Sequence, residues 1–199
     1  MDSLRRHYSA QVMEVTVSYV TTAARWTNDL TEFQNSLDLA GIFDPRVLLS
    51  GDERQAAKDK VDSVARALEH QKKLSHRMMV DFHRDVLSCH SSLPEADQAT
   101  IREPMIALLR DHLQEQAYFY QLRERWIAAV RSLIAIFDTP EQRVHFDGEQ
   151  FLFEDNEERD RFIGLLTEID EVAATEAALL EARVIRMNDR AGVLGIQIR

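Results

Sequence analysis

The chain has 199 residues, of which 45% are hydrophobic, and this is enough to bury the core of one domain. Only six glycines and four prolines are available for turns, so the composition favours a few long helices over many short strands. The net charge of -10 disfavours a surface that follows phosphates. We therefore expect neither nucleic acid nor an anionic membrane surface as a partner.

The first predicted helix covers residues 3–40. Large apolar side chains recur there at steps of three, four and seven, which places them on one stripe of a helix. These residues are Leu4, Tyr8, Val12, Val15, Tyr19, Trp26, Leu30, Phe33 and Leu37. Gly41 can adopt the left-handed conformation that commonly follows the last helical turn, and Pro45 comes shortly after it. The helix is therefore expected to end at Gly41.

The second and third predicted helices fill the middle of the chain. Ser50–Glu53 has the spacing of a capping box, so a helix is expected from there to about Ser91. Pro104 removes one helical hydrogen bond and favours a break in the next segment. Either a short helix precedes this proline or the third helix begins near Ile101. The third helix should end before Pro140.

A short β-hairpin is predicted after the third helix. Asp147-Gly148 suits a type I′ turn between two apolar segments, Val144–Phe146 and Glu149–Phe153. Pairing across this turn places four apolar side chains on one face, and that face should dock on the helices. These four residues are Val144, Phe146, Phe151 and Phe153, whereas His145, Gln150 and Leu152 face the other way.

The fourth predicted helix begins at Asp155–Glu158, another capping pattern, and continues to about Asn188. Residues 188–199 contain two glycines and are expected to form a loosely held tail. The predicted fold class is all-α: an elongated antiparallel four-helix bundle with a short β-hairpin between helices three and four. Residues 1–199 are predicted to form one domain.

The segment from Val144 through Phe153 into Leu165–Asp170 resembles the C-terminal part of some bacterial cell-envelope helical proteins. Among them is the lipoprotein family described as domain of unknown function 3053. The shared features are a hairpin around Gly148, an aromatic strand that ends at Phe153, and an acidic or polar helix start. The resemblance implies an all-helical envelope domain without an assigned activity.

Three histidines, His76, His83 and His90, stand at heptad spacing on the second predicted helix. Neighbouring members would lie about 10.5 Å apart along the axis, which is too far for one metal ion to bridge. We therefore predict no metal site. The simpler interpretation is that the histidines lie at the edge of the core. The alternative is a pH-sensing face, because unperturbed imidazoles gain charge on mild acidification.

Three consecutive aromatic residues, Tyr118, Phe119 and Tyr120, point in three directions on a helix, so at least one must face outward or lie under another element. Phe43 and Leu152 are further apolar residues outside the predicted helical stripes. If the protein acts by association, some of Tyr118, Tyr120, Phe43 and Leu152 should be more than half exposed and form one patch.

The sequence contains none of the usual nucleophile, nucleotide or metal motifs, which favours a protein without catalytic activity and without a cofactor. We expect a helical-bundle interaction or scaffold protein that binds a protein partner or associates with itself, for example as a homodimer. The alternative function is a small-ligand carrier with a cavity at the polar stretch Gln71–Ser75.

The chain begins with an amphipathic segment and has no long apolar stretch that would insert into a membrane. We therefore expect a cytoplasmic protein by default. The bacterial periplasm or cell envelope is the alternative if a signal or lipid anchor has been removed.

Overall fold

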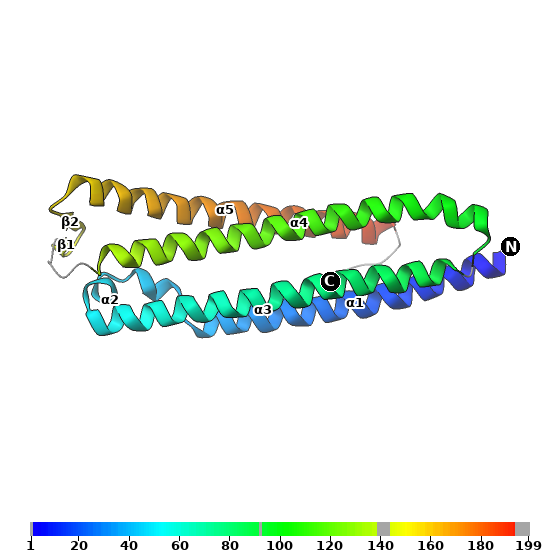
Figure 1. Ribbon diagram of the computed structural model, residues 1–199, viewed down its shortest axis with the longest axis horizontal. Coiled ribbons are helices and arrows are strands. Elements are labelled where there is room, and N and C mark those ends of the chain that lie inside the picture. The colour runs from blue at the N-terminus through cyan, green and yellow to red at the C-terminus, as the bar shows by residue number, and fades with distance from the viewer. Residues whose placement is uncertain (1, 92, 139–143, 194–199) are drawn as a thin grey trace. The chain divides into compact units, whose positions relative to one another are not determined.

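The computed structural model describes residues 2–91, 93–138 and 144–193. The predicted all-α class is confirmed, since most of these residues are helical and the strands form only a small two-stranded sheet. In chain order the elements are α1 (Asp2–Ser36), the 3-10 helix η1 (Ala40–Phe43), α2 (Pro45–Leu49), α3 (Gly51–His90), α4 (Glu95–Ile136), β1 (Val144–Phe146), β2 (Phe151–Phe153) and α5 (Asn156–Val193). The four predicted long helices correspond to α1, α3, α4 and α5, and α2 is an additional short helix (Figure 1).

The chain divides into two compact units. The described residues within 1–39 and 63–118 form the first unit, and those within 40–62 and 119–199 form the second. Both α3 and α4 contribute residues to each unit. The prediction of one domain is not tested by this division and stays a prediction.

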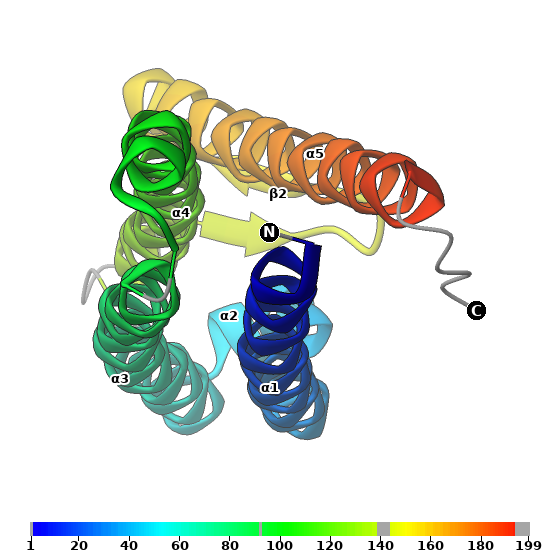
Figure 2. The ribbon, with the colours of Figure 1, turned by 90° about the vertical axis from the view of Figure 1, so that its right-hand side faces the viewer.

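In the first unit, α1 packs along α3 in the antiparallel direction, as Figures 1 and 2 show. Tyr8, near the start of α1, contacts His90 at the end of α3, and their ring centroids lie 5.2 Å apart. Tyr19 lies edge-on to Phe82 at 5.2 Å and donates a hydrogen bond of 2.8 Å to Asp85. Partial burial, and then this hydrogen bond, raise the pKa of Tyr19 to about 12.

The end of α1 differs from the prediction. The helix ends at Ser36, and the residue with positive φ is Asp38, at 47°, rather than Gly41. Gly41 instead lies within η1. An aspartate tolerates the left-handed conformation because its short polar side chain can bond to nearby backbone. The prediction that Gly41 terminates the first helix was therefore wrong.

The predicted capping box at Ser50 is half formed. The backbone N–H of Glu53 donates to the hydroxyl of Ser50 at 3.5 Å, as the pattern requires. The backbone N–H of Ser50, however, donates to the carbonyl of Arg46 at 3.0 Å, because α2 precedes this position. The start of the second predicted helix is thus confirmed. In a full capping box the Glu53 side chain would accept the backbone N–H of Ser50, but here a carbonyl of α2 accepts it.

The predicted break at Pro104 was wrong, because α4 continues through this residue from Glu95 to Ile136. A proline inside a helix costs about 3 kcal/mol through one lost hydrogen bond and a steric clash. Ending one helix and starting another leaves four carbonyl and four N–H groups without helical partners. The uninterrupted helix therefore satisfies more backbone groups than a break would.

The predicted hairpin is present in the second unit, and its faces are as expected. Val144 pairs with Phe153, His145 with Leu152, and Phe146 with Phe151. The turn differs, since four residues rather than two connect the strands, and Gly148 alone of these four has positive φ, at 105°. The carboxylate of Asp147 accepts the backbone N–H groups of Glu149 and Gln150, each at 2.9 Å, and so favours this longer loop over a type I′ turn.

An aromatic cluster attaches the hairpin to the helices of the second unit. The ring centroid of Phe151 lies 5.2 Å from that of Phe137 at the end of α4 and 5.4 Å from that of Phe162 on α5. Phe153 packs on the same Phe162 ring at 5.2 Å. Because Phe162 is buried, the hairpin covers apolar surface that α4 and α5 would otherwise expose.

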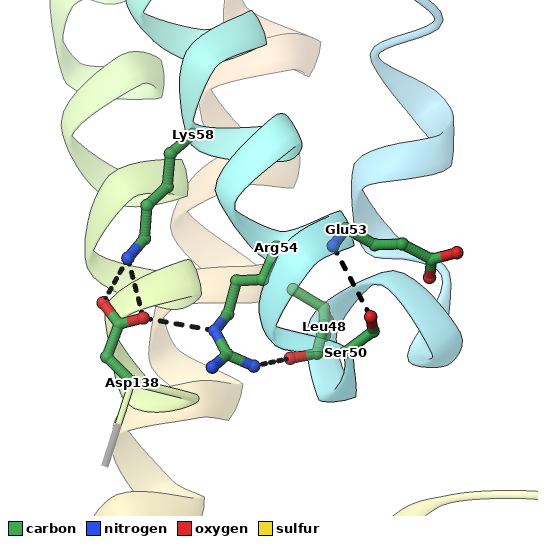
Figure 3. Close-up of polar contacts among 6 residues, drawn as sticks. All are labelled: Leu48, Ser50, Glu53, Arg54, Lys58 and Asp138. Carbon is green, nitrogen blue, oxygen red and sulfur yellow. Dashed lines mark hydrogen bonds and ion pairs between the residues drawn. The ribbon is translucent and has the colours of Figure 1, made fainter. Parts of the chain in front are cut away.

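Asp138 joins three elements of the second unit, as Figure 3 shows. Its carboxylate accepts two hydrogen bonds of 2.7 Å from Lys58 and one of 3.1 Å from Arg54, both on α3. Arg54 also donates to the carbonyl of Leu48 on α2 at 2.7 Å. Burial by itself raises the pKa of Asp138, but the hydrogen bonds and charges of Lys58 and Arg54 together outweigh it, so the pKa is lowered.

The fourth predicted helix also begins as expected, because the carboxylate of Asp155 accepts the backbone N–H of Glu157 at 2.8 Å. Its end differs, since α5 continues to Val193 and thus beyond Asn188. Residues 194–199 of the predicted tail lie outside the described residues.

Arg123 on α4 forms an ion pair with Glu176 on α5, and Arg125 pairs with Glu168 at 3.1 Å.

The first testable prediction concerns Gly148. Gly148→Val should lower the free energy of unfolding by about 1 kcal/mol or more, because valine at positive φ is strained. No atom lies within 4 Å of the added Cβ position, so the loss would come from the backbone and not from a clash. Gly164→Ala on α5 is the matched control, where the added Cβ also meets open space and should stabilise the helix by up to about 1 kcal/mol. If urea unfolding shows equal effects of Gly148→Val and Gly164→Ala, the positive φ of Gly148 would be contradicted.

The second prediction concerns pH. A carboxyl group whose pKa is lowered on folding stabilises the protein at a pH above the pKa of the unfolded chain, here 3.8. This contribution is lost as the pH falls through the lower pKa of the folded protein. Asp138→Asn should therefore cost about 0.5 to 1 kcal/mol near neutral pH, and the cost should shrink as the pH falls below 3.8. Urea unfolding of both proteins across this range tests it, with Asp170→Asn, an exposed position of α5, as the control. A cost that persists at low pH would exclude the ionic contribution.

Candidate interaction surface

Helix α1 has two apolar faces. The inner face packs on α3 and includes Tyr8, Val12, Val15, Tyr19 and Trp26, all of which are half-buried. This is the stripe predicted from the sequence, although Phe33 at its far end is exposed and the side chain of Leu4 lies outside the described ones. The inner face shows how α1 is held in the first unit. It leaves the opposite side of the same helix uncovered.

We call that opposite side the outer stripe of α1. Its residues recur at alternating steps of three and four, are all exposed, and are Ala10, Met13, Val17, Val20, Ala24, Thr27 and Thr31. Val17 and Val20 at its centre are 55% and 50% exposed. Steps of three and four repeated over three heptads are the a and d positions of a coiled-coil seam.

The threonines extend the apolar character of the outer stripe. The hydroxyl of Thr27 donates to the carbonyl of Ala23, and that of Thr31 donates to the carbonyl of Thr27, each at 2.9 Å. A threonine hydroxyl that bonds to its own helix no longer requires water or a partner for that bond. The donor hydrogen of each hydroxyl is thus already satisfied by the helix.

Few charges interrupt this surface. Glu14 is the one charged side chain between Tyr8 and Ala24, and it lies beside the outer stripe. The sequence analysis missed the outer stripe because the larger residues of the inner face dominated the periodic pattern. The low number of charges over five helical turns was the signal that could have revealed a second apolar face.

The apolar residues predicted to form a binding patch are less exposed than expected. Tyr118 and Leu152 are each 46% exposed, Phe43 is half-buried, and Tyr120 is only 4% exposed. None of the four is more than half exposed, so the expectation that some of them would be was wrong. Tyr118 does point outward while Tyr120 is buried, as expected for aromatic residues spaced two apart on a helix. Tyr118 belongs to the first unit and the other three belong to the second.

The three heptad histidines have different environments. His76 is exposed, whereas His83 and His90 are 6% and 4% exposed, so the last two belong to the core and not to its edge. The Nδ1 atom of His83 lies 3.0 Å from the carbonyl oxygen of Met79, and that of His90 lies 2.7 Å from the carbonyl oxygen of Val86. Because a carbonyl only accepts, both Nδ1 atoms carry the proton and donate it.

The second ring nitrogens differ. The Nε2 atom of His90 lies 3.2 Å from the hydroxyl of Tyr8, which can donate to its lone pair. The Nε2 atom of His83 is buried and has no hydrogen-bond partner. A pH-sensing face of all three histidines stays a prediction.

Within the described ranges, no three histidine, cysteine, aspartate or glutamate side chains gather closely enough to share a metal ion. Among the same residues, no helix has an apolar stretch long enough to cross a membrane. The outer stripe of α1 is therefore the surface that we consider further.

No protein-family model, curated protein or solved structure matches the chain. The resemblance of the C-terminal segment to envelope lipoproteins is not tested by these comparisons and stays a prediction.

The third prediction compares the two buried histidines. His90→Leu should destabilise the protein by about 1 kcal/mol more than His83→Leu, because only the first change removes the partner of a second polar group, the Tyr8 hydroxyl. Both substitutions remove an Nδ1 donor and insert a similar apolar side chain, so each serves as the control for the other. Equal losses in thermal or urea unfolding would show that the contact between Tyr8 and His90 contributes nothing measurable.

Proposed function

We propose that the protein is a non-catalytic interaction or scaffold protein that binds a helix of a protein partner, either a different protein or a second copy of this chain, along the outer stripe of α1. The observation that carries this proposal is the exposure of Met13, Val17 and Val20 on one uncharged seam. Soluble monomers rarely leave contiguous apolar patches larger than a few hundred Å² uncovered, and such patches mark interaction sites. A helix of the partner fits best, because side chains at a and d positions insert between those of a facing helix.

The width and charge of the surface argue against other classes of partner. A strict a and d stripe is narrower than the broad apolar face with which an interfacial helix enters a bilayer. The net charge of -10 further repels anionic lipid and nucleic acid. A protein partner is the class that requires neither a wide apolar face nor a basic one.

The fourth prediction tests this function with a photoreactive amino acid. Placed at Val20, it should form a covalent adduct with a protein in the cells that naturally produce the chain. Placed at Ser18, it should not, because Ser18 is exposed on the same helix but lies about 160° away around its axis. Circular dichroism of both variants controls for folding. Absence of a Val20 adduct, or equal adducts at both positions, would refute binding along the outer stripe.

A further inference from the structure

We infer that the partner of the outer stripe is a second copy of this chain, with the two α1 helices antiparallel and a two-fold axis between Val17 and Val20. This inference rests on the proposed function, because it names the occupant of the same surface. Its support comes from how the outer stripe matches its own reversed sequence, in both side-chain size and charge.

Side-chain sizes are complementary in the antiparallel arrangement. Reversing the seam about its centre places Val17 opposite Val20, Met13 opposite Ala24 and Ala10 opposite Thr27 of the second copy. Every layer then contains one a and one d position, as antiparallel helices require, and combines a larger with a smaller side chain or two valines. The central layers, Val17 with Val20 and Met13 with Ala24, then have similar volumes and can pack evenly against each other.

A parallel arrangement fits less well. It would place Met13 against Met13 and Ala24 against Ala24 of the second copy, so crowded layers would alternate with layers that leave cavities. Both overpacking and cavities cost stability. The order of large and small residues on this seam therefore favours the antiparallel direction.

The charges at the two ends of α1 favour the same direction. Arg6 is exposed near its start, on the line of the outer stripe, and Glu32 is exposed near its end, beside the outer stripe. Antiparallel copies bring the basic end of one helix to the level of the acidic end of the other, whereas parallel copies place like charges side by side. The helix dipoles also oppose each other favourably in the antiparallel pair.

A first experiment measures the mass of the full chain by sedimentation equilibrium. The unmodified protein should sediment as a dimer, at twice the monomer mass of 23.0 kDa. Val17→Glu should weaken the dimer about tenfold or more, because it buries a carboxylate at the centre of the interface. Ser18→Glu adds the same charge outside the outer stripe and should leave the dimer intact. Circular dichroism and thermal unfolding confirm that both variants fold.

A second experiment determines the direction of the helices with engineered disulfides in a Cys89→Ser background, which removes the native thiol. A mixture of Ala10→Cys and Thr27→Cys chains should form disulfide-linked dimers under mild oxidation. Ala10→Cys alone should not, because its two copies would lie about 25 Å apart in the antiparallel pair. Rapid cross-linking of Ala10→Cys by itself would establish a parallel pair and overturn the inferred geometry.

The outcomes separate this inference from the proposed function. A monomeric chain whose Val20 photoadduct is a different protein would overturn self-association and leave the proposed function standing. A monomer without any adduct would overturn both. A dimer that survives Val17→Glu but is lost after substitution elsewhere would also overturn the inference, because another surface would then hold the two copies together.

Discussion

The packing of α1 on α3 is the interaction on which the proposed binding surface depends. Tyr8 and Tyr19 hold the inner face of α1 against His90, Phe82 and Asp85. Because a helix buries one face at a time against a single neighbour, this contact determines which residues of α1 remain outside. Were α1 rotated by half a turn, its large aromatic side chains would be exposed and the small outer stripe would be buried. The size of Tyr8, Tyr19 and Trp26 therefore decides which face binds α3.

Aromatic contacts occur in both units, which differ in their polar contacts. In the first unit, contacts involve aromatic rings and histidines, and the Nδ1–H groups of the buried His83 and His90 donate hydrogen bonds to carbonyls of their own helix. In the second unit, ionic contacts are prominent, and Asp138 alone binds Lys58 and Arg54. Partly exposed ion pairs contribute little individually. The value of the Asp138 contacts lies in fixing the end of α4 relative to α2 and the start of α3.

Burial has a different effect on the ion pair between Arg123 and Glu176. Desolvation is the largest influence on Glu176 and raises its pKa, although Arg123 acts in the opposite direction. The pKa of Asp138 is lowered instead, because its carboxylate is more exposed than that of Glu176 and is contacted by two cations. The number of cations and the access of water thus decide which effect prevails. Neither follows from the spacing of charged residues along the chain.

Local signals in the sequence predicted the elements whose energetics are local. The capping residues Ser50 and Asp155 were identified because a side-chain oxygen bonds to a backbone group two or three residues away. The positive φ of Gly148 and the faces of the hairpin follow from similarly short-range rules. Gly41 and Pro104 were misjudged because the choice there is between competing backbone arrangements: the left-handed residue is Asp38, and α4 continues through the proline.

The sequence by itself determined the all-α class, the positions of the long helices, the hairpin and the existence of an apolar seam on α1, since all of these depend on periodicity and capping. Only the tertiary structure decided which of the two apolar faces of α1 is covered, and that His83 and His90 are interior while Tyr120 is not available to a partner. The physical reason is that hydrophobic burial is non-directional. A helix with two apolar faces can bury either one, and the choice depends on residues of another helix that are distant in the chain.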